Sequence, residues 1–122
     1  MAVAAYQTGV QPAPPRDETK AFPAGELVIS DDGRWFQAPG REKVLLGRRR
    51  SLRLVLCRLL EEHTARPGAA LTVDALLEAG WPGERVLPHA GAARVYVAVS
   101  TLRKLGLREV LVSRDDGYLL EP

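Results

Sequence analysis

Side chains suited to nucleophilic, acid–base or metal chemistry are few in this sequence. It contains one cysteine, Cys57, and two histidines, His63 and His89. Cys57 and His63 are six residues apart in a segment with helical patterning, whereas two side chains of one helix share a metal when they are about three or four residues apart. No nucleophile–base spacing or P-loop is recognisable. We therefore expect no catalytic residue, no metal site and no cofactor, and a protein that is not an enzyme.

Basic side chains are the other group that could do chemistry. The 122 residues include 17 Lys plus Arg and 15 Asp plus Glu, a formal net charge of +2. From Arg48 onward there are 12 basic and 9 acidic residues. Four of these basic residues form a cluster: Arg48, Arg49, Arg50 and Arg53. Such a cluster can contact phosphates, or it can be the solvated start of a helix, and the sequence leaves both readings open.

Residues 92–105 (AARVYVAVSTLRKL) form the segment around which we expect the chain to be organised. They lack Gly and Pro, and apolar side chains recur at helical spacing at Ala92, Val95, Val99 and Leu102. The pattern predicts an amphipathic helix of about four turns. Its opposite face would carry Arg94, Val97, Ala98, Thr101 and Lys104. Small, basic and hydroxyl side chains suit a helix that enters a groove, although an ordinary surface helix is the alternative.

Two further helices would support this one. Ser51 can cap a helix that extends to about Glu62, with a buried stripe of Leu52, Val55, Leu56, Leu59 and Leu60. Leu54 and Cys57 fall outside that stripe, so this helix should be covered on two sides and form the centre of the core. Thr72 should open a shorter helix, VDALLEAG, which ends near Gly80.

Short β-like runs flank the helices. Residues 25–30, 34–38 and 43–47 are separated by Asp32-Gly33 and Pro39-Gly40, which predicts a three-stranded antiparallel meander, or four strands if Phe22 joins. Trp35 and Phe36 are adjacent and should point to opposite faces. Residues 108–113 and 117–122 should form a C-terminal hairpin, and residues 70–73 could add a short strand.

The N-terminal segment differs in composition. Residues 1–21 contain three prolines and few large apolar side chains, so we expect a flexible tail or linker that precedes one domain over residues 22–122. The opening residues lack the features of a signal peptide, and no apolar run is long enough to span a bilayer. A single cysteine fits a reducing compartment. The expected location is the cytoplasm.

Three motifs together resemble a known family. LTVDALLEAGWPGE, RVYVAVSTLRKLGL and VLVSRDDGYLL are similar to the DNA-binding effector domain of OmpR/PhoB-type response regulators. The sequence also resembles the N-terminal domain of Streptomyces-type antibiotic regulatory proteins, especially at residues 47–60 and in the final GYLL. The resemblance covers about residues 22–121. It implies an α+β winged helix-turn-helix: an N-terminal antiparallel sheet, three helices and a C-terminal β-hairpin wing.

The resemblance also implies a function, that of a bacterial transcription regulator that binds double-stranded DNA in a sequence-specific manner. In that family the third helix lies in the major groove, the wing reaches toward the minor groove or the backbone, and the tryptophan after the second helix approaches the backbone. The groove-facing positions would be Arg94, Val97, Ala98 and Thr101. The positions near the backbone would be Trp81, Arg103, Lys104 and Arg114, whereas Tyr118 would pack within the wing.

Two departures from the family pattern support a second hypothesis. Ser100 and Thr101 stand where the family usually has one or two arginines, and Asp115-Asp116 in the wing would repel phosphates. The domain could instead contact protein through an apolar patch formed by Val97, Ala98, Leu105 and Leu107. Its partner would then be a second copy, RNA polymerase or another regulator domain. We expect no membrane or small-molecule partner.

Overall fold

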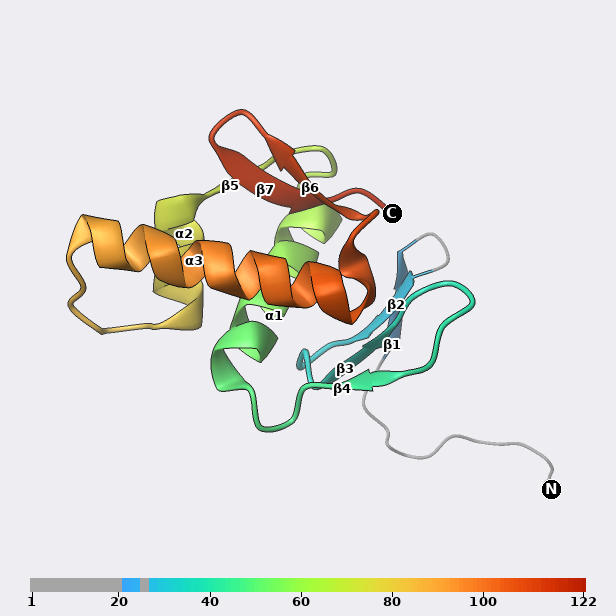
Figure 1. The fold of residues 1–122 in the computed structure, drawn as a ribbon. Helices are drawn as coiled ribbons and strands as arrows, with labels where there is room; N and C mark the ends of the chain where they lie inside the picture. The colour runs from blue at the N-terminus through green and yellow to red at the C-terminus, as the bar shows by residue number, and fades with distance from the viewer. Residues whose placement is uncertain (1–20, 25–26) are drawn as a thin grey trace, which may run out of the picture.

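The computed structural model describes residues 21–24 and 27–122, so almost all of the predicted tail lies outside the described residues. Three helices and two small antiparallel sheets are arranged along the chain (Figure 1). In chain order the elements are β1 (Ala21–Ala24), β2 (Leu27–Ser30), β3 (Trp35–Gln37), β4 (Val44–Leu45), α1 (Arg50–Ala65), β5 (Leu71–Thr72), α2 (Val73–Gly80), α3 (Pro88–Leu102), β6 (Leu111–Arg114) and β7 (Gly117–Leu120).

The N-terminal sheet has the order β1-β2-β3-β4, so the predicted meander is confirmed with its fourth strand. Phe22 pairs with Ile29, which in turn pairs with Phe36. The Asp32 carboxylate accepts hydrogen bonds from the Ser30 hydroxyl (2.9 Å) and the Arg34 backbone N–H (3.0 Å), and these bonds stabilise the β2–β3 turn. Phe36 is fully buried against the helices, while the neighbouring Trp35 is half-buried on the other face. The predicted alternation of the two aromatic rings is therefore confirmed.

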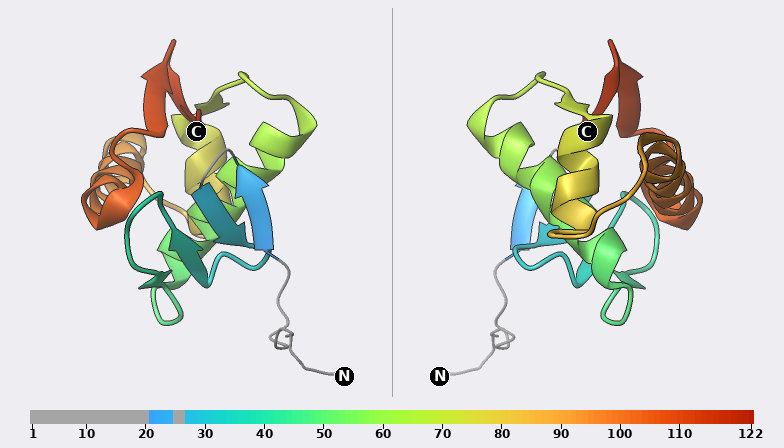
Figure 2. Two further views of the ribbon diagram at one scale, coloured as in Figure 1. Left: turned by 90° about the vertical axis from the view of Figure 1, so that its right-hand side faces the viewer. Right: turned by 90° about the vertical axis from the view of Figure 1, so that its left-hand side faces the viewer.

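Helix α1 is the central element of the core, as predicted (Figure 2). It packs against α2, α3 and β7, and its buried stripe contains all of the expected apolar residues: Leu52, Val55, Leu56, Leu59 and Leu60. The predicted cap was wrong. Residues 46–49 form a turn in which the Arg49 N–H donates to the Leu46 carbonyl (2.8 Å), and the helix begins directly after it, at Arg50. Ser51 therefore lies inside the first helical turn and does not cap it.

Helix α2 begins as predicted, because the Thr72 hydroxyl accepts a hydrogen bond from the Ala75 N–H at 3.0 Å. Helix α3 begins at Pro88, four residues before the predicted start. A proline at the first helical position loses no hydrogen bond, which explains the earlier start. Gly91 is then helical and buried. A Cβ at this position would come within 2.5 Å of the Leu77 side chain, so the glycine lets α3 approach α2 closely.

After α3 the chain makes one wide turn (Arg103–Leu107) and changes direction at Gly106, whose φ of 145° favours glycine. The C-terminal strands β6 and β7 form the predicted hairpin, with β5 added in the order β5-β7-β6. One continuous core joins both sheets and all three helices. The chain is therefore an α+β winged helix, in which α3 crosses the outside of the domain with the hairpin beside it (Figures 1 and 2).

Candidate functional site

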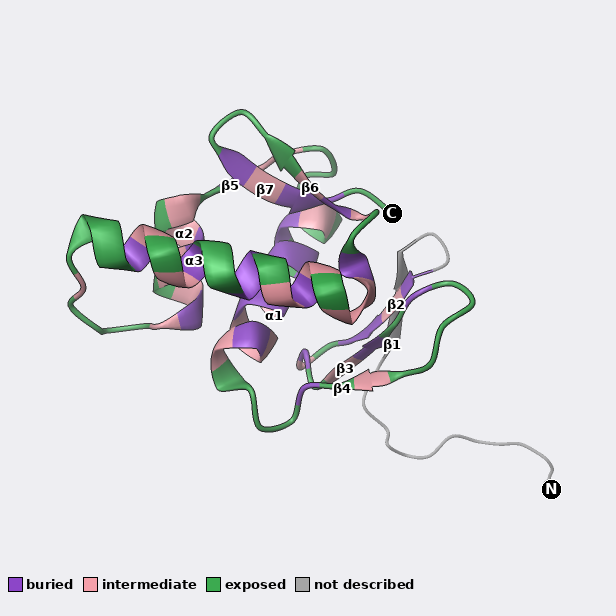
Figure 3. Ribbon diagram, in the orientation of Figure 1, coloured by how far each residue is buried: buried purple, intermediate pink, exposed green. Residues whose placement is uncertain are grey.

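Helix α3 presents one long face to solvent (Figure 3). Its inner face carries Gly91, Val95, Ala98, Val99 and Leu102, all of which are buried. The exposed residues along this face are His89, Ala90, Ala93, Tyr96, Val97 and Ser100, and Lys104 continues the face in the turn just after the helix. Val97 is 65% exposed and Tyr96 is 53% exposed, which is unusual for large apolar side chains. We refer to these seven residues as the outer face of α3.

Two assignments on α3 require correction. Ala98 was expected on the groove-facing side, but it is only 3% exposed and packs in the core. Ala92, expected in the buried stripe, is only half-buried. Gly91 and Ala98 are seven residues apart and so share one side of the helix, where their small size permits close packing. The seven-residue spacing of these two small residues could have indicated that Ala98 lies on the buried side. The outer face also includes Tyr96 and Ser100, which the sequence analysis did not assign to it.

Arg94 turns away from the outer face toward the loop after α2. Its Nη1 lies 2.7 Å from Glu84 Oε1. Its guanidinium carbon lies 5.8 Å from the centroid of the Trp81 ring, within the range of a cation–π contact. Trp81 is half-buried and also packs against the core. The structure thus brings Arg94 and Trp81 together, which the sequence analysis did not predict, and an acidic side chain pairs with the arginine.

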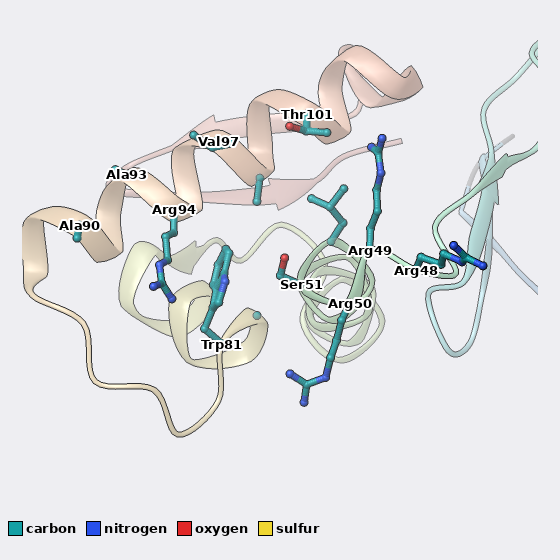
Figure 4. A pocket seen from close by; sticks show the side chains of 13 residues that line it. Arg48, Arg49, Arg50, Ser51, Trp81, Ala90, Ala93, Arg94, Val97 and Thr101 are labelled. Carbon is teal, nitrogen blue, oxygen red and sulfur yellow. The ribbon is translucent and has the colours of Figure 1, made fainter.

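A groove of about 990 Å³ lies between α3 and the start of α1 (Figure 4). It follows the side of α3 that carries Arg94. Its floor is mainly apolar, with Leu52 and Ala98, and Trp81, Val97 and Thr101 contribute to its walls. The remaining lining includes four arginines: Arg48, Arg49, Arg50 and Arg94. In Figure 4 the side chain of Arg49 extends toward Thr101, whereas Arg48 and Arg50 extend away from α3. The groove therefore has a cationic rim.

The start of α1 adds to the positive potential of this rim. Its first turn contains no acidic residue, and no side chain caps the helix. The first backbone N–H groups of a helix lack partners within the helix, and the helix dipole places partial positive charge there. No hydrogen bond or ion pair within the described part of the chain involves the side chains of Arg48, Arg49 or Arg50. This rim is suited to an anionic ligand.

Two other predicted site arginines hold the hairpin in place. Arg103 Nε donates to the Leu111 carbonyl (2.9 Å), and its guanidinium lies 5.6 Å from the Tyr118 ring centroid. Arg114 pairs with Glu121 (2.9 Å) and donates to the Gly68 carbonyl (3.2 Å). Lys104 is exposed, and no ion pair between described residues includes it. The bond from Arg103 to the Leu111 carbonyl gives this arginine a structural role that the sequence analysis did not predict.

The other flank of α3 is acidic. A second cavity, of about 580 Å³, lies between the start of α2, Tyr96 and the hairpin. Its lining includes Asp74, Asp115 and Asp116, all of which are exposed. The two flanks of α3 thus have opposite charge, with arginines on the α1 side and carboxylates on the hairpin side.

The apolar patch proposed for protein contact is not formed. Ala98 and Leu107 are buried, and Leu105 is half-buried. Of that set only Val97 is well exposed, because the turn after α3 directs Leu107 into the core. A different apolar side chain, Leu87, is 77% exposed in the loop that precedes α3.

The residues first considered for chemistry lie apart from this groove. Cys57 is half-buried on α1, and its thiol donates to the Asp31 carbonyl at 3.7 Å. Burial, together with the nearby charges of Asp32 and Glu61, raises the pKa of the Cys57 thiol.

Across the described ranges, no cluster of three or more His, Cys, Asp or Glu side chains is arranged to hold a metal. None of the described helices is long and apolar enough to cross a bilayer.

Comparison with known proteins identifies a similar fold. No protein-family model matches the sequence, and no curated protein matches it. Among solved structures, the DNA-binding domain of E. coli CadC superposes with a TM-score of 0.52 at 18% sequence identity. The alignment covers 79% of this chain and 86% of the CadC domain. At this identity the similarity supports the winged-helix fold.

Proposed function

We propose that this domain binds double-stranded DNA, with α3 in the major groove. The observation that carries the proposal is the position of the outer face of α3 next to the arginine-lined groove. A helix in the major groove reads base edges while basic side chains beside it neutralise the phosphates. The similarity in fold to the DNA-binding domain of CadC supports the same use.

Backbone contacts would come mainly from the α1 side of α3. Arg49 extends along the groove toward Thr101 (Figure 4), and the uncapped start of α1 offers backbone N–H groups to a phosphate. Trp81 and Arg94 would lie close to the same strand. Base contacts would come from Val97 and Thr101, with Lys104 at the C-terminal end of the outer face. Arg94 would join them once DNA displaces its present partner, Glu84.

The hairpin would act as the wing, beside the backbone or the minor groove. Arg114 would be its cationic contact, although its present partners, Glu121 and Gly68, would compete with a phosphate. Arg103 would act near the backbone while it fixes the hairpin through Leu111. The carboxylates on this flank weaken the approach of DNA, so the wing would contribute less than the arginine-lined groove.

At a finer level, we propose that the chain is an OmpR/PhoB-type effector domain of a bacterial transcription regulator, which works in the cytoplasm. The three motifs that carry the resemblance supply α2, α3 and the hairpin of the observed fold. Regulators of this kind act on DNA together with other proteins, so a second copy, RNA polymerase or another regulator domain are the candidate protein partners.

The direct test is binding of the purified chain to random duplex DNA at several salt concentrations, followed by selection and sequencing of the bound duplexes. We expect a steep decrease of the association constant with salt, because phosphate contacts release counterions, and an enriched sequence motif. Absence of binding at low salt would overturn the proposal.

A pair of variants tests the assigned surface. Arg49→Ala removes one charge from the groove, whereas Arg34→Ala removes one charge from the β2–β3 turn, outside the groove. Arg49→Ala should weaken binding to all duplexes and reduce the salt slope by about one. Arg34→Ala should leave both unchanged. Equal effects of the two substitutions would show that binding depends only on overall charge.

Protein contact is the second candidate function, and the exposure of Val97, Tyr96 and Leu87 supports it. A contiguous exposed apolar surface can mark an interface, and Tyr96 and Val97 are adjacent on the outer face of α3. A dimer in the absence of DNA that is lost on Val97→Ser and Leu87→Ser substitution, together with a shallow salt dependence of DNA binding, would favour this function.

A further inference from the structure

The groove between the start of α1 and α3 has an apolar interior as well as a cationic rim. Leu52 and Ala98 form its floor, and the half-buried Trp81 forms one wall. Figure 4 shows the Trp81 side chain between Arg94 and Ser51. A phosphate group would pair with the rim and leave this interior unfilled. The groove as a whole therefore matches a ligand that has an apolar body as well as an anionic group.

The size and the charge of the groove suit a small molecule of this kind. Its volume of about 990 Å³ lies at the upper end of the range of about 300–1,000 Å³ for small-molecule sites. None of the described residues that line it is acidic. Arg49 has no ion-pair partner among the described residues, and its side chain extends toward Thr101 (Figure 4). A planar guanidinium can bind a carboxylate through two parallel hydrogen bonds, so Arg49 is placed to hold the anionic group.

We propose that this groove is a regulatory site for a small aromatic carboxylate. The ring of the ligand would pack against Trp81 over the apolar floor, and its carboxylate would pair with Arg49. The bound molecule would lie where the DNA backbone is proposed to pass, so its binding should weaken the binding of DNA. Only this last consequence rests on the proposed function, because binding of the carboxylate requires the groove alone.

The probe is 2-naphthoate, and the two tryptophans of the chain provide the readout. Each indole N–H gives one signal in a nitrogen–proton correlation spectrum of the labelled protein, and the Trp35→Phe variant assigns the two signals. Trp81 lines the groove, whereas Trp35 lies on the N-terminal sheet. We expect 2-naphthoate to shift the Trp81 signal in a saturable manner and to leave the Trp35 signal unchanged.

Two matched probes separate the two parts of the ligand. 2-Naphthylmethanol keeps the rings and lacks the charge, whereas acetate keeps the carboxylate and lacks the rings. At constant ionic strength each should bind at least about tenfold more weakly than 2-naphthoate, because each loses either the charge-assisted hydrogen bonds or the apolar burial. Equal affinity for 2-naphthylmethanol would show that the arginines take no part. Equal affinity for acetate would show that the apolar interior takes no part, and either result would overturn the proposal.

Three substitutions locate the bound probe. Arg49→Ala should weaken binding of 2-naphthoate by about tenfold, through loss of a charge-assisted hydrogen bond. Ala93→Glu should also weaken it, because Ala93 is exposed and lines the groove, where a carboxylate would repel the probe. Arg108→Ala is the control, since Arg108 is exposed and lies outside the groove, and the affinity should be unchanged. Circular dichroism verifies that each variant is folded. Unchanged affinity of folded Arg49→Ala and Ala93→Glu would overturn the proposal.

DNA binding provides the second readout. At constant ionic strength, 2-naphthoate should lower the affinity for a duplex enriched by selection, and 2-naphthylmethanol should not. If 2-naphthoate binds in the groove and the affinity for DNA is unchanged, the regulatory role is overturned. If 2-naphthoate binds there and no duplex binds at low salt, the proposed function is overturned and the carboxylate site stands.

The tryptophan signals also distinguish other occupants of the groove. If the Trp81 signal does not move with 2-naphthoate, or moves together with the Trp35 signal, the carboxylate site is overturned and the proposed function stands. A shift of the Trp81 signal with protein concentration alone would show that a second copy of the chain occupies the groove. That result would overturn the proposal in favour of self-association.

Discussion

Arg103 at the end of α3 lies over the ring of Tyr118 in β7, with 5.6 Å between the guanidinium carbon and the ring centroid. The same side chain donates from Nε to the Leu111 carbonyl of β6. One arginine therefore connects the helix proposed to read DNA to both strands of the hairpin. The orientation of the wing relative to α3 depends on this connection.

Arg103→Ala should lower the free energy of unfolding by about 1–2 kcal/mol, through loss of a charge-assisted hydrogen bond and a cation–π contact. Urea denaturation measures this change. Arg103→Lys should not restore stability, because an ammonium group cannot donate to the carbonyl and stack on the ring in the same planar manner. Unchanged stability together with uniformly weaker DNA binding would show instead that Arg103 acts as a backbone contact alone.

Glu84→Gln should increase affinity for DNA. The Glu84 carboxylate lies 2.7 Å from Arg94 and neutralises it, so the substitution removes a negative charge beside the groove and frees a cation. The salt slope should become steeper by about one. Glu78→Gln is the control, since Glu78 is exposed on α2 and does not line the groove. A similar gain for both variants would indicate a general charge effect.

The double substitution Asp115→Asn and Asp116→Asn tests whether the hairpin approaches the phosphates. Asp115 has a φ of 54°, which asparagine adopts readily, so the turn should be preserved. If the wing lies near the backbone, removal of the two charges should raise affinity several-fold at low salt and less at high salt. Asp31→Asn in the β2–β3 turn serves as the remote control. No change in affinity would place the hairpin away from the DNA.

Glu62 gives the fold a predictable dependence on pH. Hydrogen bonds from Arg66 (2.9 Å), and then from Arg58 (3.1 Å), hold the pKa of the Glu62 carboxyl below its usual value of 4.5, although burial opposes this. Because the pKa is lowered in the folded state, the stabilisation is present at pH values above 4.5 and is lost as the pH falls through the folded pKa.

Glu62→Gln should therefore be less stable than the parent protein at pH 7, and the two should converge as the pH falls through the lowered pKa of Glu62. Denaturation with urea between pH 3 and 7 measures both curves. Glu61→Gln, at an exposed neighbouring position with 72% of its side chain accessible, should leave the acid limb of the curve unchanged. Parallel curves for Glu62→Gln and the parent protein would contradict the assignment.

Much of the fold is encoded in local patterns. The stripe from Leu52 to Leu60 predicts α1 because side chains three and four residues apart share a face of any helix. Asp32-Gly33 predicts a turn because glycine readily adopts the positive φ of 71° observed there. The Thr72 cap is equally local, since its hydroxyl bonds to an N–H only three residues away. Such features depend on neighbouring residues, so the sequence by itself determined them.

The site depended on contacts between different elements. Arg94 pairs with Glu84 in the loop after α2, and Arg103 bonds to Leu111 in the hairpin. The arginine-lined groove joins the start of α1 to α3, which are far apart in sequence. Periodicity could place Ala98 on either side of the boundary between the two faces of α3, and only the close packing of the helix against the core placed it inside. Local patterns thus determined which elements form, whereas tertiary packing decided which side chains remain available to a ligand, because that depends on what covers each one.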